Sequence, residues 1–451
     1  MRRFYPFRLV VLIATNCVAV LAGSPSTDRV PYAYQKIAPT VEVKFQSVPT
    51  ASLPESLILR SRLGLVTARA VNGTILHESI ANLFETRCEI MPNGDYLLMF
   101  PDGDHYNKKS EKRNDLVAYR SLDQGRTWDG PTVPIDIDYN LHGFVPLRPR
   151  GTNRIYCFGT QPRWDVYQPA SPTESENAPI GYRSSDDNGY TWSEVQLIRP
   201  VNDPEFRGMS VVRMCETESG VWLIGAHAAD WSQKPLKTRQ YILRSADQGK
   251  TWEVLPGARP AGWQAPGFGR MDETSLVSLG GENVLGLCRT PTGYLWKIRS
   301  TDGGKSWSGP EPTTLEHPDA PAMVFLLSDG KTIMVLHHNR SSGKELPMAE
   351  RAHLGGNHPA MKDRAQVWVS LSRDGGETWD APRFLLANAL LPAEQARGPF
   401  FNYQCSYMDA FVDKGIVHFF MPHRWKRVIH LTMAESELTG LPFNEALAAK
   451  Q

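Results

Sequence analysis

Five aspartates recur in one short pattern and are the first residues of this sequence that suggest chemistry. The pattern is Ser-x-Asp-x-Gly-x-Thr/Ser-Trp, and its copies begin at Ser121, Ser185, Ser245, Ser300 and Ser372. Repeated carboxylates would suit a row of acidic ligand sites. Each copy nevertheless lies between two apolar, β-rich runs, and Asp, Gly, Ser and Thr are residues that close tight turns. We therefore predict that the aspartates are turn residues and not catalytic ones: Asp123, Asp187, Asp247, Asp302 and Asp374.

The same residue types predict how each turn is held. The Asp side chain accepts hydrogen bonds from backbone N–H groups about two residues further on, and Gly adopts a positive φ. The Trp buries its ring at the start of the next strand. Each turn is then expected to dock onto its own sheet.

The runs between these turns predict short β-strands in repeated units. Tyr96–Phe100 and Leu116–Tyr119 precede the first turn, and Ile416–Met421 and Val428–Met433 follow the last one. Such strands, with turn signals between them and no long helical pattern, favour an all-β fold. Repetition at 55 to 72 residues is typical of radially arranged sheets. Val41–Phe45 alternates apolar and polar residues, and this N-terminal strand is a candidate to complete the last sheet.

Composition and the N-terminus indicate the compartment. A net charge of +1 gives no reason to expect nucleic acid or an anionic membrane surface as partner. Residues 1–22 have the basic start, apolar run and small residues of a secretory signal, and the run is too short for a membrane span. We expect a secreted or periplasmic protein with a loose lead-in (23–40), one closed domain (41–440) and a tail (441–451), with a short helix within residues 435–451.

Cysteine usage gives little evidence of metal or redox chemistry. Five cysteines remain after the signal, and they lie near apolar stretches: Cys88, Cys157, Cys215, Cys288 and Cys405. We expect most of them to be small buried residues, and one disulfide stays open. No His/Cys cluster has the spacing of zinc ligands, and no metal or organic cofactor is expected.

The repeated pattern resembles the Asp-box, or BNR, repeat of sialidases and related proteins. The resemblance extends over roughly residues 80–435 and implies a six-bladed β-propeller of four-stranded antiparallel blades. In sialidases three arginines hold the substrate carboxylate, a Tyr backed by a Glu is the nucleophile, and an Asp is the acid/base.

Three arginines match the family's carboxylate-binding triad in position. Arg87 precedes the Pro92-Asn93-Gly94 turn, although the family's Ile-Pro is absent after it. Arg289 follows Glu273 by sixteen residues, a spacing similar to that between the family's Glu and its second Arg. Arg364 precedes a strand that leads into a repeat. The resemblance thus implies that Arg87, Arg289 and Arg364 bind a carboxylate and that Glu273 supports the Tyr.

The remaining roles have more than one candidate. Tyr407 lies before a turn as the family's nucleophile does, and Tyr403 is its competitor. The acid/base is expected in the loop after Tyr96–Phe100, where Asp104 is favoured over Glu111 and Asp115. The family often has a Glu after the Tyr that orients the first Arg, but residues 419–423 contain no carboxylate.

The chemistry of these residue types agrees with the resemblance. A guanidinium binds both oxygens of a carboxylate and keeps its charge. A neutral Tyr approaches a carboxylate-bearing anomeric carbon without like-charge repulsion, but it needs a neighbouring base because its pKa is near 10. We expect an exo-acting retaining sialidase whose substrate is a sialylated or otherwise acidic glycan. The alternatives are a non-catalytic propeller that binds glycans or a protein, and a hydrolase for a different acidic sugar.

Overall fold

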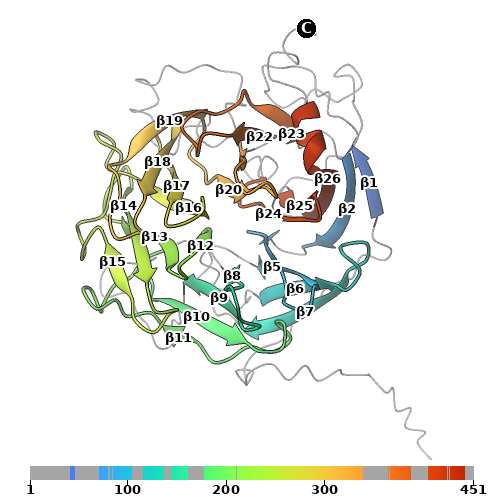
Figure 1. Ribbon diagram of the computed structural model, residues 1–451, viewed down its shortest axis with the longest axis horizontal. Helices are drawn as coiled ribbons and strands as arrows, with labels where there is room; N and C mark the ends of the chain where they lie inside the picture. The colour runs from blue at the N-terminus through green and yellow to red at the C-terminus, as the bar shows by residue number, and fades with distance from the viewer. Residues whose placement is uncertain are drawn as a thin grey trace, which may run out of the picture.

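Six antiparallel sheets surround a central axis in the computed structural model, so the predicted six-bladed propeller is confirmed (Figure 1). The first strand of each sheet lies nearest the axis. The structure describes residues 41–45, 71–79, 82–83, 85–103, 115–136, 144–160, 177–209, 211–338, 364, 366–387, 405–423, 425 and 427–441.

The first three blades are built from consecutive stretches of chain. Blade I contains β3 (Asn82–Leu83), β4 (Arg87–Ile90), β5 (Tyr96–Gly103), β6 (Asp115–Ser121) and β7 (Asp129–Asp136), with β3 and β4 both paired to β5. Blade II contains β8 (Val145–Leu147), β9 (Ile155–Thr160), β10 (Ile180–Ser185) and β11 (Gln196–Leu197). Blade III contains β12 (Met214–Glu216), β13 (Trp222–Asp230), β14 (Lys237–Ser245) and β15 (Glu253–Leu255).

The next two blades repeat this order, and the last one combines both ends of the chain. Blade IV contains β16 (Asp272–Ser278), β17 (Val284–Arg289), β18 (Tyr294–Ser300) and β19 (Glu311–Glu316). Blade V contains β20 (Met323–Leu326), β21 (Ile333–His337), β22 (Gln366–Ser372) and β23 (Arg383–Ala387). Blade VI contains β24 (Asp409–Asp413), β25 (Ile416–His423), β26 (Arg427–Ala434), β2 (Val71–Glu78) and β1 (Val41–Phe45).

Closure of the ring uses the N-terminal part of the chain, but the strand that completes blade VI is β2 and not the predicted Val41–Phe45. β2 pairs directly with β26, where Ile75 lies opposite Ile429, and β1 is added outside β2 as a fifth strand. A short 3-10 helix, Glu435–Gly440, follows β26. Radial closure with hydrogen bonds between the first and last parts of the chain leaves few strand edges open.

The core consists of apolar layers between neighbouring blades. Phe158 of blade II packs edge-on against Trp222 and Trp252 of blade III, for example. Leu285 and Val335 belong to the layer between blades IV and V. Because each sheet buries both faces against its neighbours, the strands carry apolar residues on both sides, and the blades are fixed relative to one another.

The repeated pattern forms five turns of one geometry between the third and fourth strands of blades I to V. In every copy the Ser Oγ accepts from the Gly N–H at 2.7–2.8 Å. The Asp carboxylate accepts from both the N–H and the hydroxyl of the Thr or Ser four residues later, for example at 2.8 and 2.7 Å in the first copy. The Asp carboxylate was expected to meet its donors about two residues further on, but these donors lie four residues further on. The turn contains two successive positive-φ residues, which carry the chain further before the carboxylate meets its donors.

Most of these turns dock on the preceding blade, not on their own sheet as expected. A Cβ added at Gly304 of blade IV would lie 2.5 Å from Leu223 of blade III, and one at Gly376 of blade V would lie 2.7 Å from Leu285 of blade IV. Glycine is required there because the backbone has a positive φ and a neighbouring side chain fills the space.

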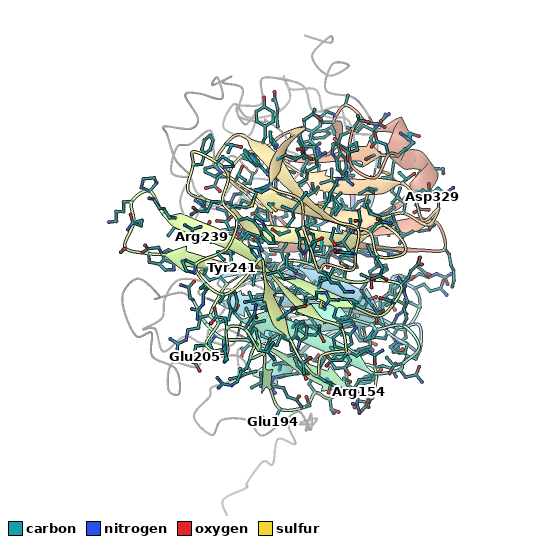
Figure 2. The ribbon with its side chains drawn as sticks, turned by 60° about the vertical axis from the view of Figure 1, so that its left-hand side comes forward. Arg154, Glu194, Glu205, Arg239, Tyr241 and Asp329 are labelled. Carbon is teal, nitrogen blue, oxygen red and sulfur yellow. The ribbon has the colours of Figure 1, made fainter. Side chains whose placement is uncertain are left out.

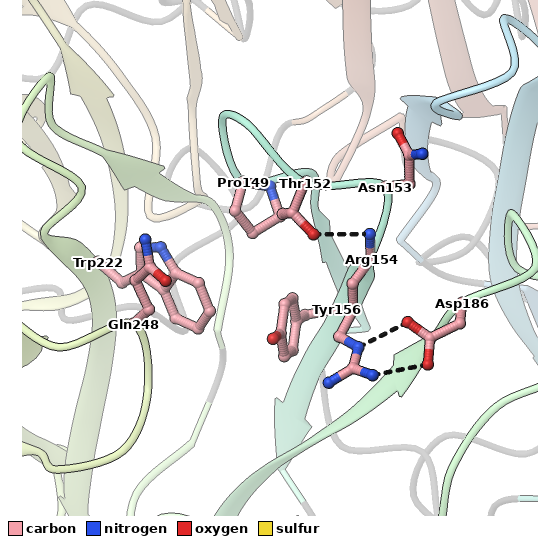
Figure 3. A pocket seen from close by; sticks show the side chains of 8 residues that line it. All are labelled: Pro149, Thr152, Asn153, Arg154, Tyr156, Asp186, Trp222 and Gln248. Atoms are coloured by element: carbon pink, nitrogen blue, oxygen red, sulfur yellow. Dashed lines mark hydrogen bonds and ion pairs between the residues drawn. The ribbon is translucent and has the colours of Figure 1, made fainter.

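The repeated turns and the starts of the inner strands lie at opposite ends of the blades. First and third strands run in the same direction, so a turn after the third strand is far from the start of the first. Figure 2 shows both ends: Arg239, near the start of β14, lies on the left, whereas Arg154 and Asp329, in turns between first and second strands, lie on the right. A cleft of about 290 Å³ at the turn end is lined by Tyr156, Trp222 and the Arg154–Asp186 ion pair, among others (Figure 3).

The cysteines are buried small residues, as expected. All five cysteines named above are buried, and no disulfide forms among them. No helix within the described ranges is long and apolar enough to cross a membrane. Residues 1–40, which include the predicted signal and lead-in, lie outside the described residues.

Candidate active site

The candidate residues gather where the inner strands begin. Glu273 is the second residue of β16, Tyr407 lies just before β24, and Arg289 ends β17 beside the start of β16. The β16–β17 register shifts between Asp272 and Ser275, and Glu273 occupies this bulge with a φ of 48°. Tyr407 has a φ of 65°. Left-handed backbone is rare for such residues, and bulges re-aim side chains, so the fold holds these two groups in unusual orientations.

Tyr407, Glu273 and Arg289 form one hydrogen-bonded group. The Tyr407 hydroxyl donates to Glu273 Oε1 at 2.8 Å, and Arg289 Nη1 donates to Glu273 Oε2 at 2.5 Å. The same Nη1 lies 3.4 Å from Tyr407 Oη. Tyr407 and Glu273 are 134 residues apart in the chain and each is only 3% exposed. A phenol, a carboxylate able to accept its proton and a guanidinium beside the phenol oxygen are thus brought together.

The surroundings of Tyr407 keep its hydroxyl protonated. Burial raises the pKa of Tyr407 well above its usual value, and the Glu273 carboxylate raises this pKa further, while Arg289 and Arg364 act in the opposite direction. The phenol is therefore neutral in the resting protein. Its proton can leave only when Glu273 accepts it, and the two arginines favour the phenolate that would form.

Arg289 is surrounded by carboxylates. Its Nε donates to Asp319 Oδ1 at 2.6 Å and also lies 3.5 Å from Asp272 Oδ1. Arg270 completes the network by donating to Asp272 at 2.8 Å and to Asp319 at 3.0 Å. Burial favours the neutral form of Arg289, but Asp319, Glu273 and Asp272 outweigh it and hold the pKa of Arg289 well above its ordinary value. Arg289 is consequently a charged but largely compensated group.

Arg364 lies in the same region but is held by uncharged partners. Its Nη2 donates to the Asp319 main-chain oxygen at 2.7 Å, and its Nη1 donates to Ser406 Oγ at 3.3 Å. Burial, followed by the nearby charge of Arg289, lowers the pKa of Arg364, which still remains a strong base. Of the three arginines predicted to bind a carboxylate, Arg364 therefore has the least compensated charge among the contacts described.

Arg87 comes close to Tyr407 through the main chain. Arg87 Nη1 donates to the Thr86 carbonyl oxygen at 2.8 Å and lies 3.4 Å from that of Tyr407. Its Nη2 is 3.4 Å from Glu85 Oε2, and both side chains are buried. Arg87 therefore has a carboxylate partner although residues 419–423 contain none. The partner comes from two residues earlier in the chain and not from the strand after Tyr407.

The formal charges that the described residues bring to the site are balanced. Four guanidiniums, those of Arg87, Arg270, Arg289 and Arg364, are accompanied by four carboxylates, which belong to Glu85, Asp272, Glu273 and Asp319. Burying so many charges is tolerable because each ion is hydrogen-bonded or paired. A substrate carboxylate would thus enter a cluster that already contains as many negative as positive groups.

The structure places neither the favoured acid/base candidate nor two of the alternative candidates. Asp104, Glu111 and Tyr403 lie outside the described residues. Asp115, the third acid/base candidate, is the buried first residue of β6 and lies opposite Asp102 in the β5–β6 register. Asp102 in turn accepts from Ser79 and lies 2.9 Å from His77 Nε2, so this part of blade I joins β2 of blade VI.

Sequence reasoning missed three carboxylates and one guanidinium of the site, which belong to Glu85, Asp272, Asp319 and Arg270. Glu85 had a readable signal, because Glu85-Thr86 repeats the Glu273-Thr274 pair and both Glu residues begin an inner-strand region with a φ near 47° (46° and 48°). Asp319 follows β19 between two prolines in the stretch His317-Pro318-Asp319-Ala320-Pro321. Such a stretch reads as an ordinary loop, and nothing local indicates that Asp319 faces the centre.

No metal site is apparent in the part of the chain that the structure describes. No group of three or more His, Cys, Asp or Glu side chains there is arranged to hold a metal ion. The carboxylates near Tyr407 are instead engaged by arginines, which is an arrangement for binding anions or moving protons.

Comparison with known proteins agrees with this fold. A sialidase from Micromonospora viridifaciens is 27% identical over 341 residues, which are 69% of this chain and 46% of that protein. A xyloglucanase from Paenibacillus sp is 28% identical over 223 residues, 46% of this chain and 20% of that protein. This chain therefore matches half or less of the length of these relatives. The solved structure of Hadza microbial sialidase Hz136 has the same fold, with a TM-score of 0.54, 17% identity, and coverage of 81% of this chain and 67% of that one.

A family model supplies the assignment. The model described as a BNR repeat-like domain matches residues 164–419, more than half of the chain. Together with the blade count and the relatives, this match defines the class of fold. The protein belongs to the BNR repeat-like domain family and has the sialidase-like, six-bladed propeller fold of glycoside hydrolases.

Proposed function

We propose that this protein is a secreted, exo-acting glycoside hydrolase of the sialidase type, which releases terminal sialic acid or a related acidic sugar from glycans. The observation that carries the proposal is the 2.8 Å hydrogen bond from Tyr407 to Glu273, with Arg289 Nη1 close to both side chains. These groups provide a nucleophile, its base and a cation that favours the developing phenolate. The sialidase from Micromonospora viridifaciens supports the same assignment.

The reaction follows from this arrangement in two displacements. Tyr407 Oη attacks the anomeric carbon as its proton moves to Glu273 Oε1. The bond to the leaving oxygen breaks, and that oxygen takes a proton from a carboxylic acid, for which we propose Asp104, with Glu111 and Asp115 as alternatives. Water then gives a proton to this carboxylate and attacks the same carbon, and Tyr407 leaves and recovers its proton from Glu273. Two displacements at one carbon retain its configuration.

The arginines account for an acidic substrate. We propose that Arg364, Arg87 and Arg289 bind the sugar carboxylate, and that Arg364 contributes most because its described partners are a main-chain oxygen and a hydroxyl. A neutral nucleophile suits such a substrate, since a carboxylate nucleophile would approach a carbon that already bears a negative group.

One observation favours a second candidate, a hydrolase for a different acidic sugar. The four arginines of the site are matched by four carboxylates, and Arg289 in particular lies among Asp272, Glu273 and Asp319. A charge-balanced site binds an anion less strongly than an open arginine triad would. The relation to a xyloglucanase likewise favours a glycoside hydrolase without specifying an acidic substrate.

The test is hydrolysis of a panel of fluorogenic glycosides by the purified protein, with α-sialosides of several linkages and a hexuronide as the other acidic sugar. Release of sialic acid, lost in Tyr407→Phe and Arg289→Ala, supports the proposal. The control is Arg154→Ala, which removes an exposed ion pair at the turn end (Figures 2 and 3). Turnover of the hexuronide alone would establish the second candidate. Binding of a glycan without turnover would indicate a non-catalytic propeller.

We also propose that the protein is exported, on the basis of residues 1–22 alone. Expression with the native N-terminus, followed by N-terminal sequencing of the exported chain, is the test. A mature chain that begins near Ser24 supports export, and an uncleaved chain retained inside the cell contradicts it.

A further inference from the structure

One residue outside the predicted set contacts two of the three triad arginines. The Asp319 carboxylate accepts from Arg289 Nε at 2.6 Å, and the Asp319 main-chain oxygen accepts from Arg364 Nη2 at 2.7 Å. Its second carboxylate oxygen accepts from Arg270 Nη1 at 3.0 Å. Asp319 itself is only 2% exposed. A single loop residue between blades IV and V therefore defines where two guanidiniums of the site lie.

The loop that carries Asp319 is itself firmly held. The His317 N–H donates to the Gly293 carbonyl oxygen at 2.8 Å, and the Ala320 N–H donates to that of Pro318 at 2.8 Å. His317 Nε2 accepts from the His338 N–H at 3.0 Å, so its other nitrogen carries the proton and points to the Pro318 carbonyl oxygen at 2.9 Å. Burial lowers the pKa of His317 well below its usual value, which keeps this neutral tautomer. Asp319 is thus a fixed point and not part of a loose surface loop.

We propose that Asp319 is a positioning residue of the active site, which orients Arg289 beside Tyr407 and Glu273 and moderates the positive charge offered to the substrate. The expected effects on kcat and KM rest on the proposed function, whereas the placement of the arginines does not. Its side chain acts on Arg289 and Arg270, whereas its main chain acts on Arg364. The two effects are therefore separable, because substitution of the side chain leaves the acceptor for Arg364 in place.

Two substitutions remove the side-chain effect and leave the main-chain acceptor for Arg364 in place. Asp319→Asn keeps the shape but offers only one oxygen, so its amide group cannot accept from both Arg289 and Arg270. Asp319→Ala removes both acceptors. Each also removes one negative charge near the place where a substrate carboxylate would bind, which favours binding of an anion. We expect kcat on a fluorogenic sialoside to fall by about 10- to 100-fold because Arg289 is misplaced, while KM stays equal or falls.

A double-mutant comparison tests whether Asp319 acts through Arg289. In the Arg289→Ala background, Asp319→Asn is expected to change kcat/KM by less than about twofold, since the group it positions is gone. The matched control is Asp203→Asn, which breaks a similar Asp–Arg pair with Arg259, with contacts of 2.8 and 3.0 Å, outside the site. Equal losses from Asp319→Asn in both backgrounds, or an equal loss from Asp203→Asn, would overturn the proposal. So would a rise in KM with unchanged kcat.

A crystallographic comparison keeps the inference testable if no sialoside is hydrolysed. In Asp319→Ala we expect Arg289 to leave its contact with Tyr407 Oη and Arg364 to keep its contact with the residue 319 main-chain oxygen. If Asp319→Ala does not fold, Asp319→Asn serves, with displacement of either Arg289 or Arg270 as the expected result. An unmoved pair of arginines overturns the positioning role. Absence of sialoside turnover by the wild-type protein, with the arginines displaced in the variant, would refute the proposed function and leave the positioning role supported.

Discussion

Replacement of Tyr407 by Phe is the most informative single change, because it removes one oxygen and leaves the ring in place. The lost hydroxyl donates to Glu273 Oε1 at 2.8 Å and lies 3.4 Å from Arg289 Nη1. Loss of a donor to a buried acceptor costs about 1–3 kcal/mol of unfolding free energy. A domain of ordinary stability, about 5–15 kcal/mol, remains almost entirely folded after such a loss. Reduced folding therefore cannot account for a large loss of activity.

The expected effect on catalysis is much larger. Removing the nucleophile of an enzyme that works through a covalent intermediate lowers kcat by roughly 10³- to 10⁶-fold. Glu273→Gln, which keeps an oxygen acceptor for Tyr407 but removes the base, should lower kcat by about 10²- to 10⁴-fold. The double variant should be no worse than Tyr407→Phe alone, since the base has no function without the phenol it deprotonates.

Three measurements decide the matter. Initial rates on a fluorogenic sialoside give kcat, urea unfolding gives stability, and proton NMR of the first product gives the anomer released. Wild-type protein should release the anomer of retained configuration. A Tyr407→Phe variant that stays within tenfold of the wild-type kcat and still gives retention would refute the assignment of Tyr407 as nucleophile.

Three further predictions concern charge, folding and pH. Glu85→Gln removes the negative charge beside buried Arg87, so we expect a lower KM for an acidic substrate together with a loss of up to about 3 kcal/mol in urea unfolding; a KM raised tenfold or more would contradict it. Asp374→Ala removes the carboxylate that accepts from Thr378 in an exposed repeat turn, and at about 1 kcal/mol for each hydrogen bond it should destabilise the fold by about 1–2 kcal/mol with kcat changed less than twofold. A tenfold loss of kcat in that variant would mean that the turn affects the distant site. Finally, stability should fall as pH falls from about 7 towards 4, because buried histidines with lowered pKa values take up protons in the unfolded chain near pH 6.5 but not in the fold. Each contributes up to about 1.4 kcal/mol per pH unit. The pKa values are about 4 for His227 and His418 and about 3 for His337 and His430. Thermal unfolding at pH 7.5, 6.0 and 5.0 measures this slope, and a midpoint that does not fall towards pH 5.0 would show that these histidines are protonated in the fold.

Local patterns in the sequence were sufficient for the architecture. Ser372, Asp374 and Thr378 close their turn within seven residues, so the pattern that specifies it is contiguous and can be read directly. The same holds for the strands on either side, whose apolar runs do not depend on distant partners. The Glu273–Arg289 pair was readable for a similar reason, because both residues belong to one hairpin, β16–β17, and its register determines their separation.

Only the tertiary structure decided which groups surround that pair. Tyr407 meets Glu273 across 134 residues, because blades VI and IV both place the starts of their inner strands near the central axis (Figure 1). Asp319 faces Arg289 and Arg364 from an ordinary-looking loop, since its direction is set by packing between blades IV and V. The sequence by itself thus determined the repeats, the blades and the Glu273–Arg289 pair, which depend on short-range hydrogen bonds. The fold decided the charge balance of the site, because buried ions select their partners by position in space and not by distance along the chain.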